Sequence, residues 1–159
     1  MEVFVKVPGP AFLRELKELF VEVGKEEDLA VAVFLQDSCC NLIEIRGNEV
    51  KDGCLERFFE VAERLKGELS GFWCDYIDPA SGLPVLTETC RILSDVEVCI
   101  RLLHMEYVTC GGCGMVKHEK FGFGVYPSTF ITNAPKDKVF NSLQKIFKDE
   151  KWNFVNLME

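Results

Sequence analysis

The sequence predicts an α+β fold in which helices pack against a mixed, mostly antiparallel sheet. Two observations support this prediction. Segments of helical periodicity alternate with short apolar runs, and several of these runs lie close enough in the chain to pair as antiparallel hairpins. A chain of 159 residues without internal repeats or linkers is the size of one domain. We therefore expect a single globular domain over residues 1–159, with a tail from about residue 151.

Four segments place apolar residues at helical spacing and have start or stop residues at their ends. The predicted helices cover residues 10–23, 52–70, 94–105 and 134–147. Asp52 is the expected N-cap of the second helix, and Ser94 and Glu97 have capping-box spacing at the start of the third. The third segment also alternates like a strand, and we favour the helix.

Six shorter segments have the apolar or alternating pattern of strands. They are residues 1–5, 29–35, 42–45, 71–77, 115–118 and 123–132. The second and third are expected to form a hairpin, and Pro127 indicates an edge or a bulge in the last strand. Residues 78–82, Asp-Pro-Ala-Ser-Gly, predict a tight turn because proline fixes φ and glycine accepts backbone angles that other residues avoid.

The balance of residue types limits the classes of partner. With 48% apolar and 28% charged residues, the chain resembles an ordinary soluble globular protein, and a net charge of -8 argues against nucleic acid as a partner. The longest apolar run, Leu29–Leu35, is too short to cross a membrane, and no export or organelle signal follows Met1. We expect a cytoplasmic protein, with a mitochondrial form if an N-terminal leader has been removed.

Few side chains are suited to common active-site chemistry. The chain has no phosphate-loop, dinucleotide-binding or nucleophile-elbow signature, and it contains two histidines. His104 is expected to be structural, and the strand pattern leaves the direction of His118 open. The eight cysteines are expected to be reduced. Cys54, Cys74 and Cys99 have the pattern of small buried hydrophobes.

The most informative motif is Cys110-Gly-Gly-Cys113-Gly114, in which glycines leave the backbone uncovered so that a sulfur can be presented to another molecule. Four interpretations stay open from the spacing: a redox dithiol, half of a zinc site, a single thiolate ligand for a soft metal, or two cysteines that fill a turn. A redox dithiol usually begins a helix, whereas a strand is predicted here. A zinc site needs a second close pair, and Cys39-Cys40 is adjacent rather than spaced.

Three segments together resemble a known family. They are Phe72–Leu83 with its Asp-Pro-Ala-Ser-Gly turn, the Gly/Cys segment through Lys117-His118, and Phe130-Ile-Thr-Asn-Ala134. In order and spacing they are similar to the CblD family of cobalamin-trafficking proteins, the methylmalonic aciduria and homocystinuria type D proteins. The resemblance covers nearly the whole chain, from the first helix to the last.

The resemblance implies a nitroreductase-like α+β sandwich that has lost flavin binding and has no enzymatic activity of its own. It also implies an adapter that binds the CblC-type protein carrying cobalamin and helps to route the cofactor toward methionine synthase and methylmalonyl-CoA mutase. No catalytic residue, intrinsic metal site or cofactor bound by the chain alone is then expected. The alternative is a flavin-dependent reductase or a CxxC thiol–disulfide oxidoreductase on the same fold, although no cluster of Arg and Lys marks a flavin phosphate site.

The resemblance further implies that one cysteine supplies a thiolate to the cobalt of partner-held cobalamin, because thiolates suit late transition metals. Cys113 matches the family cysteine and is the expected ligand. The adjacent position, where the family can have a second cysteine, is Gly112 here, so Cys110 is the alternative ligand.

Other residues match the family as support for this site. The supporting loop comprises Gly111, Gly112, Gly114 and His118, and the matching turn comprises Asp78, Pro79, Ser81 and Gly82. We expect this turn either to contact the partner or to shape the fold. The family also has a long N-terminal extension with a mitochondrial leader, whereas this chain starts at the globular domain.

Overall fold

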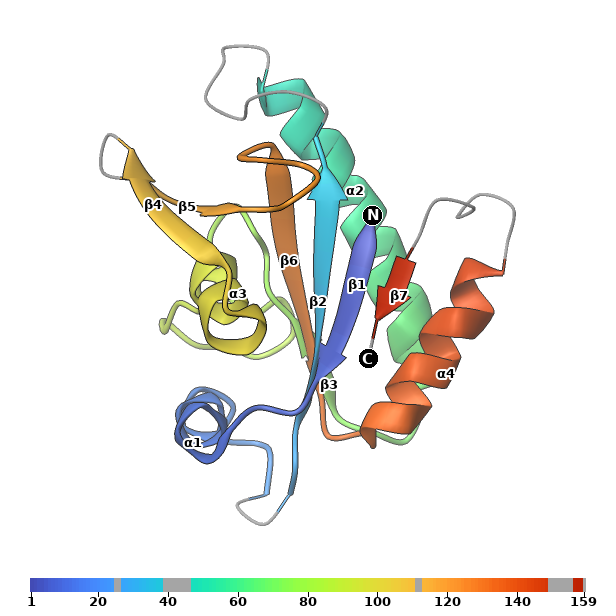
Figure 1. Ribbon diagram of the computed structural model, residues 1–159. Coiled ribbons are helices and arrows are strands. Elements are labelled where there is room, and N and C mark those ends of the chain that lie inside the picture. The colour runs from blue at the N-terminus through green and yellow to red at the C-terminus, as the bar shows by residue number, and fades with distance from the viewer. Residues whose placement is uncertain (25–26, 39–46, 111–112, 149–155, 159) are drawn as a thin grey trace.

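The computed structural model describes residues 1–24, 27–38, 47–110, 113–148 and 156–158. A central sheet lies between two layers of helices, and a separate two-stranded hairpin projects from one side (Figure 1). The prediction of an α+β fold is confirmed.

The central sheet has five strands in the described part of the chain, in the order β3-β6-β2-β1-β7. Their bounds are β1 Glu2–Lys6, β2 Ala30–Asp37, β3 Cys74–Tyr76, β6 Val125–Thr132 and β7 Asn156–Met158. Three of the four neighbouring pairs are antiparallel, and β1 pairs with β7 in parallel. The sheet is therefore mixed and mostly antiparallel, as predicted, but β7 arises from a tail for which no strand was predicted.

Two helices cover each face of the sheet (Figure 1). On one face lie α2, Gly47–Glu68, and α4, Lys136–Phe147; on the other lie α1, Pro10–Leu19, and α3, Asp95–Leu103. In β2, Ala32 and Phe34 pack toward α2 and α4, whereas Val31 and Val33 pack toward α1 and α3. A strand that is buried on both faces reads as a continuous apolar run, which explains the pattern from Leu29 to Leu35.

The helix ends differ from prediction at two places. α1 ends at Leu19, and Phe20 N–H closes it by donating to Leu16 C=O. α2 begins at Gly47, so the prediction of Asp52 as its N-cap is wrong. Val50, which is partly buried, lies one helical turn before the buried Cys54, so the inward face of α2 extends to residues before Asp52.

Ser94 is the N-cap residue of α3 as predicted, but the predicted capping hydrogen bond is not formed. α4 likewise follows Pro135 as predicted. The strand predicted at residues 42–45 lies outside the described residues.

The two strands predicted after the cysteine motif belong to different sheets. The first, β5, spans Cys113–Lys117 and lies in the projecting hairpin, whereas β6 is in the central sheet. Of the two alternatives predicted for Pro127, the bulge is wrong, because Pro127 pairs with Leu35 in continuous register. The pairing of β3 with β6 ends at Tyr76↔Phe130. Among the described residues, the part of β6 around Pro127 therefore pairs with a strand on one side, which corresponds to the predicted edge position.

Candidate functional site

The cysteine motif lies in the projecting hairpin, whose strands are β4, Glu106–Cys110, and β5, Cys113–Lys117. The two strands are antiparallel, and Cys110 and Cys113 are register partners on the last rung. Gly111 and Gly112, which separate them in the chain, lie outside the described residues. Both cysteines are therefore placed at the end of the hairpin that is farthest from the body of the molecule (Figure 1).

The hairpin is fixed to the body on one face. Val116 is buried in the core beside α1 and α3, while its register partner Tyr107 is half exposed. The Tyr107 ring lies over Gly114, because a Cβ added to Gly114 would come within 2.8 Å of Tyr107 Cε2. Gly114 thus makes room for an aromatic ring on the neighbouring strand, an arrangement that stabilises exposed strand glycines.

The base of the hairpin carries an ion pair across its first rung. Lys117 Nζ lies 3.3 Å from Glu106 Oε2, and both side chains are about half exposed or more. Exposed pairs of this kind contribute up to about 1 kcal/mol. The pair therefore adds little to the stability of the fold.

His118 follows β5 and forms a tight turn with Gly122. His118 and Gly122 exchange two backbone hydrogen bonds of 2.9 Å, and the imidazole stacks on Phe121 at 4.4 Å between ring centres. His118 Nδ1 accepts hydrogen bonds from the backbone N–H groups of Lys120 at 3.2 Å and Phe121 at 3.3 Å. Because Nδ1 accepts, the ring proton is on Nε2.

That proton points to Glu2, a buried carboxylate at the start of β1. His118 Nε2 donates to Glu2 Oε2 at 3.1 Å, and Lys120 Nζ donates to Glu2 Oε1 at 2.5 Å. Burial acts to raise the pKa of Glu2, but the hydrogen bonds from Lys120 and His118 and the positive charge of Lys120 together lower it below its ordinary value. Glu2 is therefore a carboxylate that binds two side chains of the segment leaving the hairpin.

A groove of about 840 Å³ lies at the foot of the hairpin. Its walls come from β1, the C-terminal end of α3 and the residues that enter and leave the hairpin, and they include Phe4, Lys6, His104, Met105, Lys117 and Lys120. His104 caps α3 in the left-handed conformation, with φ of 53°, which is the structural role expected for it. The groove offers apolar and charged contacts directly below the strands that carry the cysteines.

The turn at residues 78–82 is formed as predicted. The Asp78 carboxylate accepts hydrogen bonds from Ala80 N–H at 3.0 Å and Ser81 Oγ at 2.7 Å. Pro79 lies between Asp78 and Ala80 in the chain. Gly82 has φ of +73°, and its carbonyl accepts from Leu93 N–H at 2.8 Å. The turn thus packs against the segment that leads into α3.

The turn and the cysteines are not brought together. The turn lies at the N-terminal side of α3, and the hairpin begins after the C-terminal end of that helix. A helix of nine residues is about 13 Å long. The candidate residues therefore fall into two groups, one around the hairpin and one around the turn.

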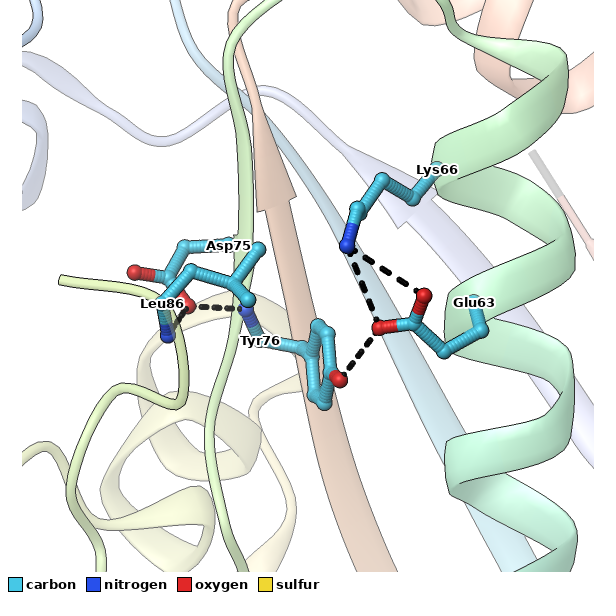
Figure 2. Close-up of polar contacts among 5 residues, drawn as sticks. All are labelled: Glu63, Lys66, Asp75, Tyr76 and Leu86. Carbon is cyan, nitrogen blue, oxygen red and sulfur yellow. Dashed lines mark hydrogen bonds and ion pairs between the residues drawn. The ribbon is translucent and has the colours of Figure 1, made fainter.

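Sequence reasoning missed Asp75, the buried acid of β3. Its Oδ1 accepts from the backbone N–H groups of Tyr76 at 2.7 Å and Leu86 at 3.0 Å, and its Oδ2 accepts from Thr87 N–H at 2.9 Å. Figure 2 shows that Tyr76 points the opposite way, toward α2, where its hydroxyl donates to Glu63 at 2.6 Å. One short strand therefore holds a loop on one side and a helix on the other.

Glu63 is shared between the strand and its own helix. Tyr76 and Lys66 both donate to its carboxylate (Figure 2). The hydrogen bond from Tyr76 lowers the pKa of Glu63, while burial and that same bond raise the pKa of Tyr76. The arrangement keeps Tyr76 protonated, so it serves as a hydrogen-bond donor and not as a base.

The cysteines inside the body are unsuited to act as ligands. Cys54, Cys74 and Cys99 are buried, as predicted, whereas Cys90 is exposed. Removal from water raises the pKa of both Cys74 and Cys99, so these thiols stay protonated. Cys39 and Cys40 lie outside the described residues.

The part of the chain that the structure describes contains no group of three His, Cys, Asp or Glu side chains arranged to hold a metal ion. Within the same residues, no helix combines the length and the apolar composition needed to span a bilayer.

Comparison with known proteins identifies relatives across most of the chain. A family model described as methylmalonic aciduria and homocystinuria type D protein matches residues 4–146. Two curated relatives are both described as cobalamin trafficking protein CblD. The protein of Rattus norvegicus is 28% identical over 130 residues, which cover 78% of this chain and 43% of the relative. The protein of Homo sapiens is 28% identical over 137 residues, which cover 80% of this chain and 45% of the relative.

The chain thus spans less than half the length of the curated relatives that it matches. The family match extends from β1 to the last turn of α4 and includes the hairpin and the 78–82 turn. The resemblance drawn from the sequence is confirmed, and the chain belongs to the family of the methylmalonic aciduria and homocystinuria type D protein.

Proposed function

We propose that this chain is a cobalamin-trafficking adapter without enzymatic activity of its own. It docks on a CblC-type protein that holds cobalamin, and it helps to direct the cofactor toward methionine synthase and methylmalonyl-CoA mutase. Family membership and the names of the two curated relatives support the trafficking role. The 28% identity and the partial coverage of those relatives make the partner and the two target enzymes part of the proposal.

The chemical step of this proposal is ligation of the partner's cobalt by a thiolate from Cys113, with Cys110 as the alternative ligand. The observation that carries it is the position of both residues on the last rung of a hairpin that projects beyond the helical layers. A thiolate is a polarizable ligand suited to a late transition metal, and ligation displaces one proton from the thiol. In the body, by contrast, the described thiols of Cys54, Cys74 and Cys99 are buried.

The geometry argues against the thiol–disulfide oxidoreductase alternative. In such enzymes the first cysteine usually sits at a helix N-terminus, where the helix dipole lowers the pKa of its thiol. Here Cys110 ends one strand and Cys113 begins the next. A flavin-dependent reductase remains the other alternative, and the absorbance of the purified protein near 450 nm decides it: roughly stoichiometric flavin would replace the adapter proposal.

Visible spectroscopy tests the ligation step. The protein is mixed with a cobalamin-loaded CblC-type partner, and the corrin absorption is compared for wild type, Cys113→Ser, Cys110→Ser and Cys90→Ser. Cys90 is the matched control because it is exposed but lies outside the hairpin. We expect wild type, Cys110→Ser and Cys90→Ser to change the spectrum and Cys113→Ser to leave it unchanged. An unchanged spectrum with wild type would reject ligation, and a change that survives both hairpin substitutions would reject these ligands.

A further inference from the structure

We propose that Glu2 is a positioning residue for the cysteine hairpin: it fixes the direction of the hairpin by binding His118 and Lys120, and so sets where the thiol meets the partner's cobalt. This inference rests on the proposed function for its chemical meaning. The anchoring of the hairpin by Glu2 can be tested without it.

The contact joins two parts of the fold that are distant in sequence. Glu2 is separated from His118 by 116 positions and from Lys120 by 118. Glu2 itself is held in the central sheet, where its backbone pairs with Leu35 on one side and Asn156 on the other. The carboxylate therefore transfers the rigidity of the sheet to the segment that leaves β5.

The geometry at His118 leaves little freedom. The imidazole is fixed at Nδ1 by two backbone donors, at Nε2 by Glu2 and on its face by Phe121. Glu2 is 3% exposed and His118 is 9% exposed, so water competes weakly for these hydrogen bonds. Since His118 directly follows Lys117, the last residue of β5, the contacts that hold the imidazole also restrain the backbone at the base of the hairpin.

The length of the hairpin magnifies small movements at its base. A strand of five residues is about 16 Å long, so a tilt of about 10° at the base moves the tip by about 3 Å. Functional ligands must be held to within about 0.5 Å of their productive positions. Loss of the Glu2 contacts should therefore change the position of the thiol without removing the hairpin, since Val116 stays buried in the core.

The test compares Glu2→Gln and Lys120→Met with the control Glu68→Gln. Glutamine keeps one acceptor oxygen but presents an NH₂ group to a second donor, so it cannot satisfy both His118 and Lys120. The control removes an ion pair between Glu68 and Lys145, 2.7 Å apart, which links α2 to α4 and does not involve the hairpin. All three variants are made in the full chain.

Hydrogen exchange of the free protein measures the anchoring directly. In Glu2→Gln we expect the amides of β4 and β5 to exchange about tenfold faster than in wild type, while those of β2 stay unchanged. Lys120→Met should give a smaller acceleration, because Lys120 is largely exposed and His118 keeps its contact. Glu68→Gln should leave the hairpin amides unchanged. Equal hairpin exchange in wild type and Glu2→Gln would overturn the inference.

Cobalt ligation measures the consequence. At saturating cobalamin-loaded partner, the ratio of ligated to unligated cobalt should fall about tenfold in Glu2→Gln, within the range known for residues that orient metal ligands. Its affinity for the cobalamin-free partner should stay within about threefold of wild type. An equal loss of both would assign Glu2 to docking and overturn positioning. If wild type fails to ligate cobalt, the proposed function fails, while faster hairpin exchange in Glu2→Gln would still support the anchor.

Discussion

The two sheets of this molecule are stabilised in different ways. The central sheet is covered by helices on both faces, and β2 and β6 contribute buried residues to both layers of core. The hairpin of β4 and β5 has one fully buried residue, Val116, among its described side chains, and its aromatic residue Tyr107 is half exposed. The difference indicates that the covered sheet provides most of the stability, whereas the hairpin provides little and carries the cysteines of the proposed ligation step.

This difference can be tested with one aromatic residue from each sheet. Phe130 of β6 is fully buried and stacks on Tyr76, whereas Tyr107 of β4 is half exposed and lies over Gly114. Phe130→Ala should lower the free energy of unfolding by about 3–5 kcal/mol because it leaves a cavity. Tyr107→Ala should lower it by about 1 kcal/mol or less. Urea unfolding measures both, and equal losses would show that the hairpin is part of the stabilising core.

The covered side should also respond to pH through Asp95, which opens α3. Removal from water raises the pKa of this carboxyl to about 7 from its ordinary 3.8; Thr129 opposes this rise in part, and the Asp78 carboxylate adds to it. Because the folded state holds the proton more tightly, the stabilising contribution is complete below pH 3.8 and is lost as the pH rises toward 7. The loss is on the order of 4 kcal/mol.

Urea unfolding of wild type and Asp95→Asn from pH 4 to 8 tests this expectation. The variant has no carboxyl at this position, so the difference in stability between the two proteins should shift in favour of the variant as the pH rises. A constant difference across this range would show that Asp95 is ionised throughout. A hairpin substitution that changes no ionisable group, such as Gly114→Ala, should keep the wild-type pH dependence.

The smallest expected effects come from one substitution made both in the 78–82 turn of the body and in the hairpin. A Cβ at Gly82 would lie 2.5 Å from Ile92 Cγ2 at a backbone with φ of +73°, so Gly82→Ala should cost about 1–3 kcal/mol. At Gly114 the obstacle is the half-exposed Tyr107 ring, which can swing toward solvent, so Gly114→Ala should cost less than about 1 kcal/mol. Thermal unfolding compares the two, and a larger cost at Gly114 would contradict the view of the hairpin as loosely packed.

The main elements of the covered region could be predicted from the sequence because their patterns are local. The apolar run from Leu29 and the helical spacing within residues 134–147 reflect burial against the sheet, and both elements are present. The strand β4 was missed, although Tyr107, Val108 and Thr109 before a Gly-Gly pair are a hairpin signal. The predicted helix ended at residue 105, directly before β4, and the residues from 106 to the glycine pair were assigned to no element.

The polar contacts could not be predicted, because their partners are far apart in sequence. Nothing near Glu2 indicates a contact with His118, and nothing near Asp75 indicates that it binds Leu86 and Thr87. A buried acid has the same sequence signal as a solvated one, and only the assembled fold distinguishes them. The positions of Cys110 and Cys113 on one rung likewise depend on β4, which the sequence prediction lacked.

Asp75 has a consequence for how the surface of this protein can vary. Its carboxylate recognises the peptide N–H groups at positions 86 and 87, and every residue except proline provides such a group. The side chain at position 86, which is exposed, can therefore change while the loop keeps its path. One buried acid in a three-residue strand thus allows the surface of the neighbouring loop to change its side chains while the loop backbone stays the same.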